Sequence, residues 1–187
     1  MKKLVAVLVS LVFLLTILTG CSNSKIDTFN KFIANANKIN KESKKNDSKL
    51  LKLYSEMNSA TSDKNAASKG LEVIKKTDVL IATKASLMEE ALGEIRKAKD
   101  VNASSELNVY TGMLERAWQT ELDAIKVLKQ GNKLAKDVFG QLKKMKLPEE
   151  GKIDEMTNTY NKAGSMEDKA RKLEADATAY FNANVNK

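Results

Sequence analysis

Hydrophobic residues recur at alternating steps of three and four along most of the chain. The longest stretch follows Ser104, continues for about ten helical turns and contains one charged position, Glu121. Its positions are Leu107, Tyr110, Leu114, Ala117, Glu121, Ala124, Leu128, Gly131, Ala135, Val138, Leu142 and Met145. This spacing predicts one apolar stripe along a long helix, because residues three and four apart share a helix face.

Three other segments repeat the pattern, and we expect helices over residues 25–59, 63–99, 104–145 and 148–184. Cap-forming residues precede the second and third segments. Pro148 is expected near the first helical position of the fourth, with Glu149 and Glu150 in its first turn. Long helices joined by short loops pack as antiparallel neighbours. The sequence therefore predicts an all-α fold, an elongated up-and-down antiparallel bundle of four long helices.

The first expected helix has the least regular apolar stripe. Between Asn40 and Asp47 the stripe is polar, so we expect the helix to be bent or locally broken there. A three-helix bundle with a loosely docked first helix is the alternative architecture.

Two acids and one tryptophan fall on or beside the predicted stripes. Asp78 lies between Ile74 and Ile81, and Glu121 interrupts the longest stripe. A buried acid can mark a functional site, but an acid in such a position more often reaches solvent at the edge of a layer. Trp118 is expected in the core.

The N-terminal segment has a different character. Lys2 and Lys3 precede residues 4–19, which carry no charge and would span about 24 Å as a helix. This segment has fewer than the roughly 20 apolar residues that are needed to cross a bilayer, and it ends in the small residues Thr19 and Gly20. This arrangement predicts a secretory signal peptide.

The residues Leu18-Thr19-Gly20-Cys21 resemble the lipobox of bacterial lipoproteins. In that family a diacylglycerol is attached to the cysteine sulfur, and the signal peptide is removed just before it. The resemblance implies a cleaved signal over residues 1–20, a lipidated tether over 21–24 and a helical domain over 25–187. It implies a location on the outer face of the cell membrane, since two acyl chains suffice for stable residence there.

The resemblance is to lipoproteins of low-GC Gram-positive bacteria, although a Gram-negative envelope stays open. The helical part looks loosely like small lipoproteins of bacilli described as cell-wall-binding. Cys21 is the only cysteine, so the chain cannot form an intramolecular disulfide.

Catalytic chemistry has few candidates in this sequence. There is no histidine, which excludes Ser-His-Asp and Cys-His catalysis and histidine-containing metal sites. Neighbouring acids such as Glu89 and Glu90 point about 100° apart on a helix, and lysines lie near each such pair. We expect no enzyme activity, no metal and no cofactor other than the covalent lipid on Cys21.

Basic residues are distributed unevenly. Without Lys2 and Lys3, the chain has 30 Lys or Arg against 24 Asp or Glu, a net charge of +6. Five lysines repeat at three, four, three and seven residues on one face of the third expected helix: Lys126, Lys129, Lys133, Lys136 and Lys143. We call these five residues the lysine face.

In an up-and-down bundle anchored at Cys21, residues 39–77 and 124–162 form the half away from the membrane. That half carries a net charge of +8, and the other half −2. Charges 30 Å or more from a lipid surface are not attracted to it, because electrostatic interactions are screened over roughly 8 Å at physiological salt. An upright molecule would therefore offer the lysine face to anionic wall polymers or to an acidic protein, whereas a bundle lying flat could offer it to anionic headgroups.

Three hypotheses about function follow. The first is a lipid-anchored extracytoplasmic binding or scaffold protein that engages anionic envelope polymers through the lysine face. The second is a protein partner role at the membrane surface, in immunity, exclusion or complex assembly. The third places function in the released signal peptide, because Leu11–Gly20 resembles enterococcal peptide pheromones. Nucleic acid is disfavoured by the compartment, and a small-molecule site between helices stays open.

Overall fold

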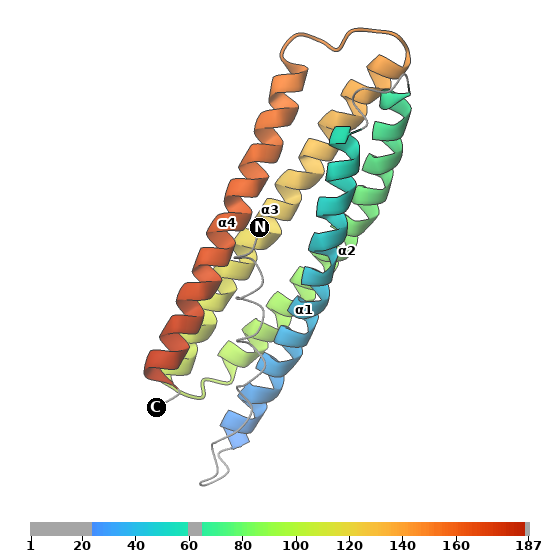
Figure 1. Ribbon diagram of the computed structural model, residues 1–187. Helices are drawn as coiled ribbons and strands as arrows, with labels where there is room; N and C mark the ends of the chain where they lie inside the picture. Colours follow the sequence, from blue (N-terminus) through green and yellow to red (C-terminus); the bar gives the residue numbers. More distant parts are fainter. Residues whose placement is uncertain (1–23, 60–64, 186–187) are drawn as a thin grey trace.

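The computed structural model describes residues 24–59 and 65–185, which form four helices and no strand. They are α1 (Ser24–Ser59), α2 (Ala66–Asp100), α3 (Ser105–Lys143) and α4 (Lys152–Asn184), and they alternate in direction along one elongated bundle (Figure 1). At 1.5 Å per residue, the 39 residues of α3 extend about 58 Å. The predicted all-α up-and-down bundle is confirmed. The signal peptide, Cys21 and most of the tether lie outside the described residues.

The helices contact one another in chain order, α1 with α2, α2 with α3, and α3 with α4. No Cα atom of α1 comes within 8 Å of a Cα atom of α4. These two helices meet only through side chains, and we call their junction the α1–α4 seam. The bundle is therefore closed on three sides by helix packing and on the fourth by side-chain contacts.

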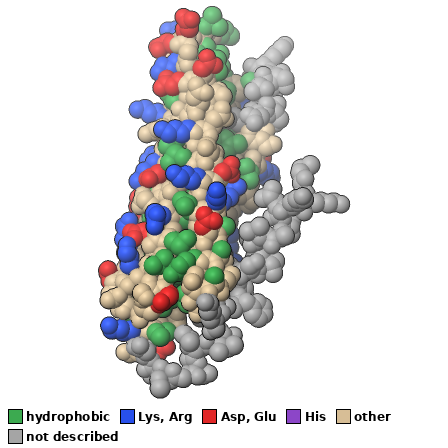
Figure 2. Space-filling view, turned by 90° about the vertical axis from the view of Figure 1, so that its left-hand side faces the viewer, with side chains coloured by type: hydrophobic (Ala, Val, Ile, Leu, Met, Phe, Trp, Pro, Cys, Tyr) green, Lys and Arg blue, Asp and Glu red, His purple; other side chains and the backbone are tan. Residues whose placement is uncertain are grey.

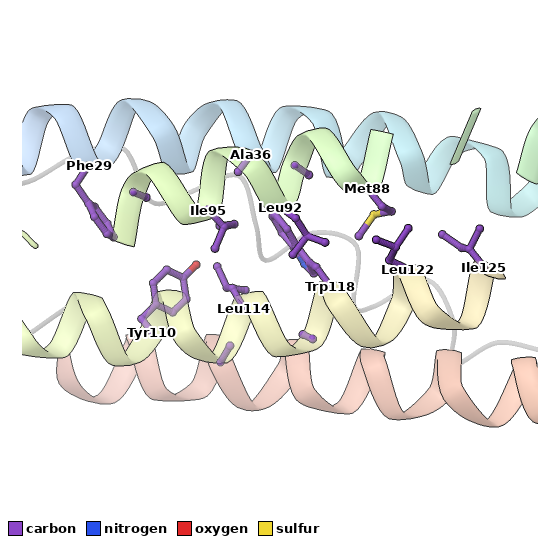
Figure 3. Packing of buried hydrophobic residues seen from close by; sticks show 14 of the residues in the cluster. Phe29, Ala36, Met88, Leu92, Ile95, Tyr110, Leu114, Trp118, Leu122 and Ile125 are labelled. Atoms are coloured by element: carbon purple, nitrogen blue, oxygen red, sulfur yellow. The ribbon is translucent and has the colours of Figure 1, made fainter. Parts of the chain in front are cut away.

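The hydrophobic core is concentrated toward the end of the bundle where α1 begins. Phe29 and Ala36 of α1 point into the space that Leu92 of α2 and Leu114 and Trp118 of α3 also fill (Figure 3). Trp118 is 1% exposed, which confirms its predicted place in the core.

The predicted break in α1 is wrong, because the helix runs without interruption from Ser24 to Ser59. Its polar middle faces inward, and Asn40, Ser43 and Asn46 are buried. Charged groups on α2 and α4 pair with part of this stretch, so the helix does not need to leave the bundle. The three-helix alternative is wrong for the same reason, since α1 packs along α2.

The turn from α2 into α3 is formed by residues whose types suit their backbone conformations. Asn102 takes a left-handed conformation, with φ 51°, just after α2 ends. Ser104 is the N-cap of α3 and accepts a hydrogen bond from the Leu107 amide through its side chain at 3.2 Å.

The connection from α3 to α4 differs from the prediction. Helix α3 ends at Lys143, and α4 begins at Lys152, so Pro148 lies in the connection and not in a first turn. The reason is local backbone geometry. Met145 has φ 56°, and the Met145 and Lys146 amides donate to the Leu142 and Gln141 carbonyls, each at 3.0 Å. This pair of bonds is a Schellman motif, which ends a helix.

The start of α4 is set by Gly151, which has φ 79° and is the N-cap residue. The acids in the first turn are consequently Asp154 and Glu155, and not Glu149 and Glu150 as predicted. Negative charge still lies at this helix N-terminus, where the helix dipole favours it.

Candidate functional site

All five residues of the lysine face are exposed along α3. Two of them have intramolecular partners: Lys136 Nζ lies 2.7 Å from Asp78 Oδ2 of α2, and Lys126 Nζ lies 3.4 Å from Asp123 Oδ1. Lys129, Lys133 and Lys143 form no ion pair within the described ranges. These three lysines are therefore the part of the face whose charge is free for a partner.

The structure also shifts the charge division between the two halves of the bundle. Asp78 lies beside Lys136, and hence in the half away from the start of α1, because α2 and α3 are antiparallel and bring these residues to one level. Counting Asp78 there lowers the positive excess of that half by one charge. The excess of basic over acidic residues remains on the same side.

A buried ion-pair cluster lies inside the middle of the bundle, and the sequence pattern did not lead us to expect it. Lys84 of α2 is almost fully buried, and its Nζ lies 2.6 Å from Asp47 Oδ1 of α1 and 3.0 Å from Glu121 Oε1 of α3. The expectation that a stripe acid reaches solvent is thus wrong for Glu121, which is 8% exposed. Three helices are joined through one ammonium group.

The carboxylates of this cluster change the proton affinity of Lys84. Burial alone would lower the pKa of Lys84, but the Glu121 and Asp47 carboxylates outweigh it and raise that pKa above its ordinary value. Burial raises the pKa of Glu167 on α4, and the nearby Lys84 ammonium only partly opposes this. Lys84 therefore stays charged at neutral pH, and the Glu167 carboxyl is harder to ionise than an exposed glutamate.

Glu174 of α4 bridges the α1–α4 seam. Its carboxylate accepts hydrogen bonds from Lys44 Nζ at 2.7 and 2.8 Å and from Asn40 Nδ2 at 3.2 Å. Trp118 Nε1 of α3 donates to the same carboxylate over a longer distance of 3.4 Å. Two acceptors in this layer, Asn40 Oδ1 and Ser43 Oγ, are buried without a hydrogen-bond partner among the described residues. This seam layer is therefore polar but incompletely satisfied.

Asn132 of α3 is the centre of a second and fully satisfied polar layer. Its Nδ2 donates to Thr77 Oγ1 at 2.9 Å and to Asp78 Oδ1 at 2.8 Å. Its Oδ1 accepts from the hydroxyls of Tyr54 at 2.9 Å and Tyr160 at 2.8 Å. Since these partners come from α1, α2 and α4, one buried amide connects all four helices.

The two tyrosines of this layer also contact each other across the seam, with ring centroids 5.6 Å apart. Gly131 makes room for the Tyr160 ring, because a Cβ at that position would lie 2.9 Å from it. Burial raises the pKa of both Tyr54 and Tyr160, so both phenols keep their protons and donate to Asn132.

A shallow hollow of about 400 Å³ lies between α2 and α3 in the half that contains the start of α1. Glu115 is one of its lining residues and pairs with Arg96 Nε and Lys99 Nζ, each at 2.9 Å. One carboxylate thus already compensates two of the cations that line the hollow. The lysine face carries more uncompensated positive charge than this hollow.

Within the described part of the chain, no group of three or more metal-ligating side chains is placed to hold an ion. No helix in the same ranges is both long enough and apolar enough to cross a membrane. The buried polar clusters, with their acids and bases already paired, are suited to holding four helices in register.

The sequence does contain traces of these clusters. Lys84 lies three residues after Ile81 and four before Met88, and so occupies a position of the α2 stripe. In α1, Asn40 and Ser43 continue the three-and-four spacing from Ala36. Read as stripe positions, these residues are compatible with a polar interior as well as with a broken helix.

Comparisons of the chain with protein-family models, with curated proteins and with solved structures found no match.

Proposed function

We propose that the protein is a lipid-anchored binding protein of the cell envelope that holds anionic envelope polymers on its lysine face. The observation that carries this proposal is the exposure of Lys129, Lys133 and Lys143 on one side of α3 without an intramolecular ion pair within the described ranges. Lysine ammonium groups are compact point charges on flexible stems, which suits repeated phosphate groups of variable geometry.

The position of these lysines favours a partner beyond the membrane. Helices α1 and α3 start at the same end of the bundle (Figure 1). Lys129 lies 24 residues after the start of α3, about 36 Å along the helix. That distance is several times the screening length of roughly 8 Å at physiological salt. On an upright molecule tethered at Cys21, the lysine face would not be attracted to the anchoring bilayer.

The polar layers described above support this function indirectly. Lys84 and Asn132 each connect several helices, so α3 is held at a fixed rotation within the bundle. A fixed rotation keeps the three free lysines on the outside. The bundle would thus act as a rigid support that keeps the lysine face exposed.

The proposal is tested by co-sedimentation of residues 22–187 with purified cell wall at low salt. This part of the chain contains every described helix and the whole core. We expect Lys129→Glu/Lys133→Glu/Lys143→Glu to abolish sedimentation. Lys136 is left intact because its partner Asp78 also holds Asn132, and a glutamate there would damage the fold.

The matched control is the triple change of Lys162, Lys169 and Lys172 to Glu. These lysines are exposed on α4, and the control alters the net charge by the same amount. We expect it to sediment as the parent does. Equal loss in both variants would mean that net charge, and not the lysine face, governs binding. Retention of binding in the first variant would refute the proposal, and salt-insensitive capture of one membrane protein would support the partner role instead.

The anchor is tested separately, in cells producing the full chain. We expect the parent to incorporate labelled palmitate and to enter the detergent phase, and Cys21→Ser to do neither. Labelling of Cys21→Ser equal to that of the parent would contradict a lipid at this position.

A further inference from the structure

The end of the bundle where α3 meets α4 carries exposed apolar side chains. Met145 is 98% exposed and Leu147 is 89% exposed, the two highest values among the large hydrophobic residues that the structure describes. Leu142 and Ile153 are exposed on either side of them. We call these four residues the apolar tip. Hydrophobic side chains gather at this upper end of the molecule in the space-filling view (Figure 2).

The backbone holds the apolar tip outward. Met145 adopts a left-handed conformation that residues other than glycine seldom take, and the Schellman bonds to Gln141 and Leu142 close the helix beneath it. On the other side, Gly151 turns the chain into α4. The connection is therefore a formed turn whose apolar side chains point away from the core.

Basic residues alternate with the apolar ones in the same turn. Lys143, Lys144 and Lys146 are exposed and form no ion pair with any residue in the described ranges. Glu149 and Glu150 are exposed in the second half of the connection and partly offset this charge. The first half thus combines apolar side chains with uncompensated positive charge.

We propose that the apolar tip inserts into an anionic lipid surface facing the end of the bundle opposite residue 24. Met145 and Leu147 would enter the boundary between headgroups and acyl chains, and the three lysines would contact anionic headgroups. A fluid bilayer can take up protruding side chains without a binding surface of complementary shape. A second copy of the chain is a poorer fit, because four side chains fall far short of the roughly 800 Å² per partner in a stable interface.

The test is flotation of residues 22–187 with vesicles of equal parts phosphatidylcholine and phosphatidylglycerol, and with phosphatidylcholine alone. We expect binding to the anionic vesicles. Met145→Gln/Leu147→Gln should lower the partition coefficient about 100-fold, because burial of each side chain contributes at least about tenfold. Glu149→Gln/Glu150→Gln should strengthen binding, because it removes the opposing charge.

The matched control is Leu51→Gln/Val79→Gln, which alters two exposed apolar residues on the shaft of the bundle. It should bind vesicles as the parent does. All six positions are exposed, so circular dichroism should show parental helix content in each variant. Equal binding by the tip variant and the parent, or equal losses in the tip variant and this control, would overturn the proposal.

Insertion itself is tested with Met145→Cys, since residues 22–187 contain no cysteine. An environment-sensitive dye on this cysteine should shift its emission to the blue with anionic vesicles. Lys129→Glu/Lys133→Glu in the same background tests the shaft of α3, and the shift should persist. Loss of the shift in that variant, or no shift while the labelled protein floats, would refute insertion by the tip. These arms do not use wall polymer, so they stand apart from the test of the proposed function.

Discussion

Replacement of Lys84 by methionine should strongly destabilise the bundle. Methionine fills a similar volume, so the change mainly removes the charge that compensates Asp47 and Glu121. Glu121 is 8% exposed, and its carboxylate would be left inside the bundle without a cation. Asp47 reaches solvent more easily and should suffer less.

The expected magnitude follows from the cost of leaving a buried charge unpaired. Removal of one partner of a buried ion pair typically costs about 3–5 kcal/mol. Because Asp47 is partly hydrated, we expect Lys84→Met to lie at the lower end, at about 3 kcal/mol. Lys84→Met/Glu121→Leu removes both charges and should be less destabilised than Lys84→Met alone, since well-packed apolar residues can replace a buried pair at little cost.

Urea unfolding of residues 22–187, followed by circular dichroism at pH 7, measures these differences. A loss below about 1 kcal/mol at pH 7, or a double variant less stable than Lys84→Met, would refute the buried ion-pair cluster.

Three further predictions concern the interior. Burial raises the pKa of Glu167, so the stability that its protonated carboxyl contributes is present below the unfolded pKa and is lost as pH rises through the folded pKa. The free energy of unfolding of Glu167→Gln, measured in urea, should therefore rise relative to that of the parent between pH 4 and 7. A pH-independent difference would contradict this. Gly131→Ala should lower the free energy of unfolding by about 1–3 kcal/mol, because its Cβ would lie 2.9 Å from the Tyr160 ring. Gly140→Ala on the same helix meets nothing within 4 Å and should raise that free energy by up to about 1 kcal/mol. Equal shifts of the melting temperature in the two variants would refute the close approach. Asn132→Asp should cost at least about 3 kcal/mol in urea unfolding, because it removes two buried donors and adds a charge; a near-neutral effect would mean that the amide does not connect the helices.

The helices could be predicted because their determinants are local. The apolar stripe that begins at Leu107 predicts a long helix whatever it packs against, although α3 ends at Lys143, before Met145. A serine at the predicted boundary, Ser104, is the N-cap of that helix. The predicted start of α4 was wrong because proline is compatible with both the first turn of a helix and a connecting segment, and Pro148 lies in the connection. The left-handed residues Met145 and Gly151 decided between the two.

The polar interior could not be predicted in the same way. Asp47 and Lys84 belong to different helices, and their pairing depends on the register in which α1 packs on α2. A polar position on an apolar stripe has two solutions, a break in the helix or a partner across the bundle. The sequence pattern of Asn40 to Asp47 is compatible with both.

The lysine face was fully predictable as a row of exposed residues, since spacing alone defines a helix face. Its partial neutralisation was not, because Asp78 approaches Lys136 only through the packing of α2 against α3. The structure thus reduces five candidate lysines to three with free charge, Lys129, Lys133 and Lys143.

The affinity of residues 22–187 for purified cell wall across a salt series is the most direct measure of whether the lysine face binds an anionic envelope polymer. We expect binding that weakens steeply as salt rises, and no binding even at low salt after Lys129→Glu/Lys133→Glu/Lys143→Glu. Absence of binding at low salt, or binding that does not respond to salt, would contradict the claim.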